Sequence, residues 1–177
     1  MNPERVAVFI DKSNVYKYLA DLRKINKQWV CLYDPLRLAQ KLAGDRTLVG
    51  TYFYCTPPPA HMLSSSQGAT NHALQVKYYG EIQNMSEVEV RFGNLLGSGK
   101  NLSEKNLDTQ LTANMISLAA QNMFDVAVLV SNDRDYVSAL EPTKNIFGKK
   151  IELLYFKGFI SNALWRLADV PRKARPS

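Results

Sequence analysis

VAVFIDKSN, residues 6–14, joins a continuous run of five apolar residues to a polar turn that begins with Asp11. Similar apolar runs recur along the chain, at Leu48–Cys55, Val88–Phe92, Val126–Val130 and Ile151–Phe156. Continuous apolar runs, in contrast to alternating ones, indicate strands that are covered on both faces. The first stretch therefore predicts the first of about five buried strands.

Segments with helical spacing lie between these runs. One apolar stripe, which ends at Gly44, consists of Leu36, Leu38, Ala39 and Leu42. A more regular stripe precedes the fourth apolar run and consists of Leu107, Leu111, Met115, Leu118 and Ala119. Strands that alternate with helices predict an α/β fold, with a largely parallel sheet and helices on both of its faces.

Length and composition limit the class of protein. The 177 residues predict one domain over residues 1–170, followed by a basic, disordered tail at 171–177. A hydrophobic content of 46% excludes a wholly disordered chain, and no apolar run approaches the roughly 20 residues of a membrane span. The chain also starts without a secretory signal pattern. We expect a cytoplasmic protein with reduced cysteines and no membrane contact.

The charge balance points to a polyanionic partner. The net charge is +6 and the isoelectric point is near 9.3, which favours association with nucleic acid. Basic residues cluster after the first strand at Lys17, Arg23, Lys24 and Lys27. Such a cluster is usually a solvated helix face. This one lies in the element that follows directly after the predicted site, so it is also a candidate for contact with a phosphate backbone.

Acidic residues follow the predicted first and fourth strands. Asp11 ends the first run, SNDRD at residues 131–135 follows the fourth, and Asp108 begins the helix between them. In a doubly wound sheet, ligands bind at the carboxyl ends of the strands, where the strand order reverses. We therefore expect Asp11, Asp108, Asp133 and Asp135 on one rim.

Four carboxylates on one rim favour a hard divalent cation. Like charges repel unless a cation neutralises them, and Mg²⁺ and Mn²⁺ prefer oxygen ligands. A cation held in this way can activate water for attack on phosphorus. Each aspartate taken alone is better read as a helix cap, since Asp, Asn and Ser are routine at strand-to-helix junctions. The four together favour the metal site.

The chain resembles NYN domains, the LabA-like branch of the PIN-like nucleases. The resemblance rests on VFIDKSN at 8–14, EKNLD at 104–108, SNDRDY at 131–136 and GKK at 148–150. It implies a Rossmann-like PIN fold and a ribonuclease that depends on Mg²⁺ or Mn²⁺, with Asp11, Asp108, Asp133 and Asp135 as catalytic acids and metal ligands.

The expected substrate is RNA, single-stranded in preference to duplex. Asn14 and Ser131 are expected to hydrogen-bond ligands or the scissile phosphate. Lys12, Lys105 and Arg134 are expected to meet substrate phosphates. The sequence leaves open whether the chain forms a homodimer.

Several residues depart from the family pattern. The family usually has Gly where this chain has Lys12, Asn106 and Asn132, many relatives carry an acid at the position of Asn114, and a small residue is common at the position of Arg134. Asn tolerates the left-handed backbone conformation, so two of these changes are mild. Lys12 could bind a substrate phosphate or compete with the metal.

The alternative function is therefore a non-catalytic nucleic-acid-binding or regulatory protein with a blunted metal site. A phosphatase-like hydrolase is less favoured, because no Asp-x-Asp follows the first strand.

Overall fold

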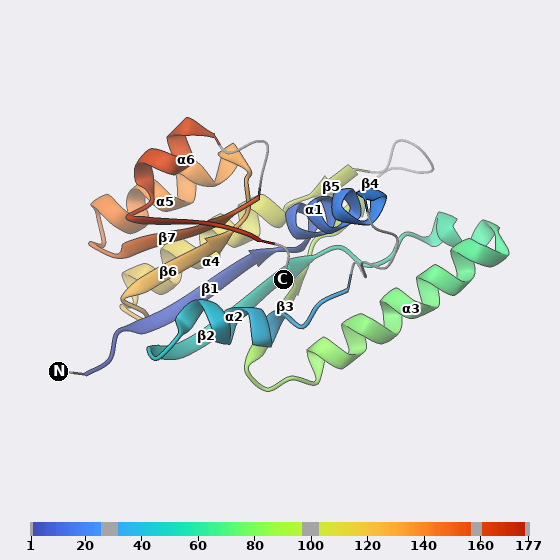
Figure 1. Cartoon of the computed structure of the whole chain (residues 1–177), viewed down its shortest axis with the longest axis horizontal. Coiled ribbons are helices and arrows are strands. Elements are labelled where there is room, and N and C mark those ends of the chain that lie inside the picture. The colour runs from blue at the N-terminus through green and yellow to red at the C-terminus, as the bar shows by residue number, and fades with distance from the viewer. Residues whose placement is uncertain (1, 26–31, 97–102, 157–160, 176–177) are drawn as a thin grey trace.

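The computed structural model describes residues 2–25, 32–96, 103–156 and 161–175, and its centre is a sheet of six parallel strands (Figure 1). Their spatial order is β3-β2-β1-β6-β7-β8, with the bounds β1 Arg5–Asp11, β2 Thr47–Cys55, β3 Val88–Phe92, β6 Val126–Val130, β7 Lys150–Tyr155 and β8 Val170–Lys173. A separate antiparallel pair consists of β4 (Asn94–Leu96) and β5 (Ser103–Lys105). The expected α/β class with a parallel sheet is confirmed.

Helices cover both faces of this sheet. They are α1 Lys12–Ile25, α2 Pro35–Ala43, α3 Ser66–Gln83, α4 Leu107–Ala120, α5 Val137–Asn145 and α6 Asn162–Leu167, with short 3₁₀ turns η1 Ala60–Ser64 and η3 Arg134–Tyr136. In β1, Val8 and Ile10 pack with α1, α2 and α3, whereas Ala7 and Phe9 pack with α4, α5 and α6. This alternation places Asp11 on the same face as Phe9 and α4.

The five predicted apolar runs all form strands of the sheet. All five residues of β6 are buried, because this central strand has helices on both faces and strands on both sides. The sixth strand, β8, pairs with β7 at the edge of the sheet. Residues 171–173 were expected in a disordered tail, and this part of the prediction is wrong. The strand VPRK is polar and half-exposed, so it carries no apolar run that could reveal it.

Helix α3 extends away from the sheet (Figure 1). Its buried residues are Tyr79 and Ile82, near its C-terminal end. Leu74 and Val76 are 53% and 50% exposed. The N-terminal half of α3 packs against η1. This part of the molecule, η1 with α3, is called the arm below. Within the described residues, no helix combines the length and the apolarity that crossing a membrane demands.

The strand order of the described sheet reverses between β1 and β6. From β1 the chain moves to β2 and β3 on one side, and from β6 it moves to β7 and β8 on the other. Ile10 and Val130 are paired at the carboxyl ends of these strands. Asp11 and Ser131 therefore emerge next to each other, although 120 positions separate them in the sequence.

Candidate functional site

Asp11 lies at the centre of a dense set of hydrogen bonds. Its Oδ2 accepts from the Asn14 amide at 2.6 Å, the Ser131 hydroxyl at 3.1 Å and the Tyr136 hydroxyl at 3.2 Å. Its Oδ1 accepts from the Asn14 backbone N–H at 3.2 Å, as an N-cap of α1 would. Asp11 is 6% exposed, so these donors replace the water that a surface carboxylate would keep.

Tyr136 links Asp11 to Asp108. Its hydroxyl lies 2.7 Å from Asp108 Oδ1 and 3.2 Å from Asp11 Oδ2, while its ring is buried under the sheet. A phenol has one hydrogen, so it can donate to only one of the two carboxylates at a time. Sequence reasoning assigned no role to Tyr136, because a lone tyrosine beside a buried strand is usually a core residue. The only available signal was its place directly after the SNDRD motif.

The start of α4 presents Asp108 to this site. Asn106 has φ 73°, the left-handed conformation, immediately before the first helical residue. The tolerance of asparagine for that conformation explains how the chain manages without the glycine of the family pattern. Leu107 is buried in the core and Asp108 points away from it, exposed toward the rim.

The loop after β6 brings in the second acidic motif. Ser131 is fully buried; its hydroxyl donates to Asp11 and accepts from the Asp133 N–H at 3.0 Å. The Asp133 carboxylate accepts from the Asp135 N–H at 3.1 Å and so caps η3. Asp135 is exposed. One hydroxyl, that of Tyr136, therefore connects Asp11 to Asp108. Asp133 is connected to Asp11 through its backbone N–H and the Ser131 hydroxyl, and Asp135 lies at the surface.

Burial and charge both act on this pair of acids. Desolvation raises the pKa of Asp11 above its ordinary value, the hydrogen bonds from Asn14 and Ser131 oppose this, and the nearby Asp108 carboxylate raises it further. Burial also raises the pKa of the Tyr136 hydroxyl, and the two carboxylates strengthen the effect. Tyr136 therefore acts as a neutral hydrogen-bond donor, and Asp11 takes up a proton more readily than an ordinary exposed aspartate does.

The residues that depart from the family pattern have distinct positions. The Asn132 side chain bonds both the N–H and the C=O of Phe156, at 2.8 and 3.0 Å, and so ties the ends of β6 and β7 together. Asn114 donates to the Tyr54 hydroxyl at 2.7 Å. The Lys12 ammonium lies over the rings of Tyr16 and Tyr79, 4.9 and 5.7 Å from their centres. Lys105 forms the end of β5.

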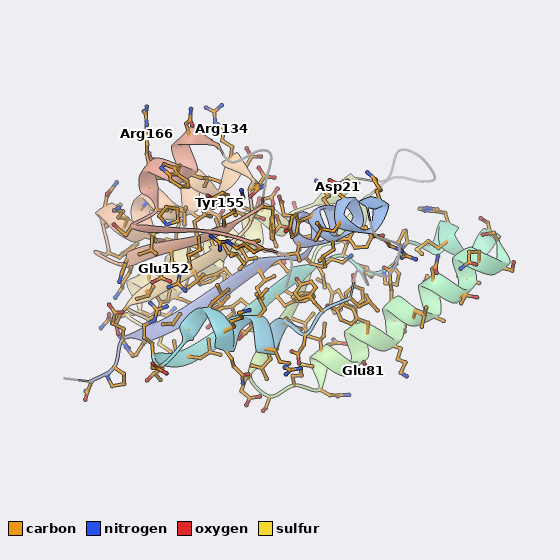
Figure 2. The ribbon with its side chains drawn as sticks, viewed as in Figure 1. Asp21, Glu81, Arg134, Glu152, Tyr155 and Arg166 are labelled. Carbon is orange, nitrogen blue, oxygen red and sulfur yellow. The ribbon has the colours of Figure 1, made fainter. Side chains whose placement is uncertain are left out.

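A cleft of about 700 Å³ lies between α1 and the loop after β6. Asn14 and Asp133 line it at the acidic site, and Lys17 and Arg134 add positive charge. Figure 2 shows the Arg134 side chain reaching outward from the surface. Tyr16 lines the same cleft and is 43% exposed. We call this hollow the acidic cleft.

The metal-binding capacity of these residues is modest. Within the part of the chain that the structure describes, no three Asp, Glu, His or Cys side chains form a group that could hold a metal ion. Asp11 and Asp108 provide two carboxylates. Mg²⁺ is commonly bound by one or two carboxylates together with waters and substrate phosphates. The pair therefore fits a cation that binds together with its phosphate substrate better than a permanently held ion.

A family model, the NYN domain, matches residues 5–172. The chain belongs to the NYN domain family. This family is a PIN-like nuclease family whose nucleases generally use divalent metals, and the match confirms the resemblance drawn from the sequence motifs. The matched range includes β1 through most of β8, so the missed edge strand is part of the NYN domain.

The fold also recurs in a solved structure. A crystal structure of a protein of unknown function from Vibrio parahaemolyticus has a TM-score of 0.66 and 17% sequence identity, over 98% of this chain and 94% of that chain. At this identity the similarity concerns the fold alone. No curated protein matches the chain.

Proposed function

We propose that this NYN-domain protein is a ribonuclease that hydrolyses phosphodiester bonds with the help of Mg²⁺ or Mn²⁺. The observation that carries the proposal is the convergence of Asp11 and Asp108 on one hydroxyl at the strand-order reversal of the sheet. Two carboxylates from distant parts of the chain are held close together, although their repulsion is unfavourable without a cation. A divalent ion would remove that cost.

Each site residue has a role in the proposed reaction. Asp11 and Asp108 would hold the cation, which would activate water and stabilise charge at phosphorus when bound. Asp133, whose carboxylate lines the acidic cleft, would orient the water or complete the ligand set, with Asp135 farther out. Asn14 and Ser131 hold Asp11 in place, and their hydrogen bonds oppose the rise in its pKa that burial causes. Lys12, Lys105 and Arg134 would meet phosphates.

The basic cleft supports a nucleic acid substrate. Lys17, Lys24 and Arg134 line the acidic cleft together with Asp21 and Asp133. Asn14, which donates to Asp11, lines the cleft as well, and the chain as a whole carries +6. Positive groups around an acidic centre attract a phosphate backbone while leaving the carboxylates available for a cation. A cleft lined by an exposed tyrosine suits a single strand, whose bases are free to stack.

The decisive experiment compares cleavage of single-stranded RNA by wild type, Asp108→Asn and Asp45→Asn with Mn²⁺ or Mg²⁺. Asp108→Asn keeps an acceptor for Tyr136 and removes one metal-binding charge. Asp45 is an exposed acid before β2, at the far end of the sheet, and is the matched control. We expect Asp108→Asn to lose roughly 100-fold or more of the rate, and Asp45→Asn to match wild type. Equal activity of all three proteins would refute the assignment.

A second candidate is a non-catalytic NYN-domain protein that binds nucleic acid. One observation favours it: the carboxylate of Asp133 caps η3, and no group of three metal-ligating side chains is present among the described residues. RNA binding that is unaffected by EDTA, without cleavage under any divalent ion, would support this candidate over the nuclease.

A further inference from the structure

A second hollow lies on the opposite side of α1 from the acidic cleft. It has a volume of about 260 Å³ and is lined by α1, from Lys12 in its first turn to Arg23 in its last, by the arm and by Leu32. Its polar lining consists of Lys12, Arg23, Asn71 and Gln75, and its aromatic lining includes Tyr16 and Tyr79. We call it the arm groove.

The chemistry of the arm groove is that of a nucleic acid contact. Among its described lining residues there are two cations and two side-chain amides, and no carboxylate. Cations select for phosphate, and amides can pair with the edges of bases. Exposed aromatic rings stack on bases of any sequence, and Tyr16 at 43% exposure can do so, whereas Tyr79 is buried. The groove is smaller than the roughly 300–1,000 Å³ of pockets that enclose a whole small ligand. It suits one nucleotide of a longer strand.

The arm groove and the acidic cleft meet at Tyr16. This side chain lines both hollows and is 43% exposed. The Lys12 ammonium lies against the same ring, on the side of the arm groove. A strand that occupies the acidic cleft can therefore cross α1 at Tyr16 and continue past Lys12 into the arm groove.

We propose that the arm groove binds single-stranded RNA on the side of Tyr16 away from the aspartates, so that the arm acts as a clamp on longer substrates. The proposal rests on the proposed function for the substrate class, but it concerns affinity and needs no cleavage. It also gives a role to the N-terminal half of α3, which extends away from the sheet (Figure 1).

The test measures binding of labelled single-stranded RNA in EDTA, with oligonucleotides of ~4 and ~12 nucleotides. Gln75→Glu places a negative charge in the arm groove, and Gln83→Glu makes the same change at the exposed end of the same helix. We expect Gln75→Glu to weaken binding of the longer RNA roughly ten-fold and the shorter one much less. Gln83→Glu should bind both as wild type does.

A second pair of variants tests the electrostatic contact. Arg23→Ala should lower the slope of log affinity against log salt by about 0.7 for the longer RNA, the amount expected for one lost phosphate contact. Lys41→Ala, an exposed cation on α2, should leave the slope unchanged. A structural defect would not change the salt slope in this selective way.

The outcomes separate this inference from the nuclease proposal. If Gln75→Glu and Arg23→Ala bind the longer RNA as wild type does, or lose both RNAs equally, the clamp is refuted, whether or not the protein cleaves RNA. If the binding pattern appears but wild type cleaves nothing with Mn²⁺, the clamp stands and the nuclease fails.

Discussion

Tyr136 serves both the core and the candidate site. Its ring is 1% exposed and packs with Phe9, Leu111 and Leu140, while its hydroxyl lies between two carboxylates. A buried aromatic ring is fixed by packing, so the hydroxyl is held in one place. The position of the Asp11–Asp108 pair therefore depends on the core beneath it.

Tyr136→Phe removes this hydroxyl and keeps the ring. Because hydrogen bonds to charged groups contribute about 1.5–3 kcal/mol, we expect the free energy of unfolding at neutral pH to fall by about 1.5 kcal/mol. Metal-dependent cleavage should fall roughly 10- to 100-fold, as for other groups that orient metal ligands. Urea unfolding and cleavage rates measure the two effects. Tyr155→Phe, a half-buried tyrosine on β7, is the control, and equal losses in both variants would contradict this role.

Asp11 and Asp125 are expected to change stability in opposite directions with pH. Burial raises the pKa of Asp11 above 3.8, so the folded protein holds this proton more tightly than the unfolded chain. Its contribution is full below 3.8 and is lost as pH rises through the raised pKa. Hydrogen bonds from Arg5 lower the pKa of Asp125 from 3.8 to about 2, so that contribution is lost as pH falls across this interval.

Urea unfolding between about pH 2 and pH 7 separates the two groups. Asp11→Asn should remove the decline in stability above pH 4, and Asp125→Asn should remove the decline below it. A profile of Asp11→Asn that keeps the wild-type decline above pH 4 would show that Asp11 is not the group responsible.

At the scale of elements, contacts between segments set the position of α4. Gly93 follows β3, and its N–H donates to the Cys55 carbonyl at 2.9 Å. A Cβ built on Gly93 would lie 2.5 Å from Leu107 Cγ, a contact that forces the neighbour to move. Leu107 is the first residue of α4 and precedes Asp108. The glycine therefore permits the approach that brings Asp108 to Asp11.

Gly93→Ala should displace the start of α4. We expect a loss of about 1–3 kcal/mol in unfolding free energy from overpacking, together with reduced cleavage because Asp108 moves. Gly80→Ala in α3 is the matched control: its Cβ would meet nothing within 4 Å, and alanine in a helix should stabilise the protein by about 0.5–1 kcal/mol. Wild-type stability and activity of Gly93→Ala would contradict the packing argument.

At the scale of the whole molecule, the carboxyl end of the sheet carries the candidate site, and the amino end carries a network of ion pairs. Near the amino end, Glu152 of β7 is 1% exposed and receives two hydrogen bonds from Arg46, at 2.6 and 3.1 Å, and an ion pair from Arg172 of β8 at 2.9 Å. Arg46 also donates to the carbonyls of Leu42 and Ala43 at the end of α2. This network connects α2, β7 and the edge strand, and it lies away from the aspartates.

Arg46→Met should therefore lower stability without changing the chemistry. Removing one partner of a buried ion pair costs about 3 kcal/mol, because Glu152 keeps its charge and loses its main donor. Lys77→Met, which breaks an exposed ion pair with Glu81, should cost less than about 1 kcal/mol. Cleavage per folded molecule should equal that of wild type in both. A reduced rate in fully folded Arg46→Met would show that the two ends are coupled.

Local patterns allowed much of this structure to be predicted. The apolar runs located five strands of the sheet, including the edge strand β3, and the stop at Gly44 located the end of α2, where φ is 61°. The other edge strand, β8, and the β4–β5 pair were missed, because these short segments carry no continuous apolar run. Asp11 and the acids after the fourth apolar run were predicted to share one rim, because the ends of neighbouring parallel strands lie at one edge of the sheet.

The sequence alone determined the order of the five strands with apolar runs and the positions of the acids after β1 and β6, because both follow from the local spacing of apolar and polar residues. Only the tertiary structure decided which acids meet. The hydroxyl of Tyr136 reaches Asp108 across 28 residues and Asp11 across 125, through the packing of α4 and η3 against the sheet. Contacts between residues so far apart in the sequence form only when the whole chain packs around its core, so no local sequence pattern encodes them.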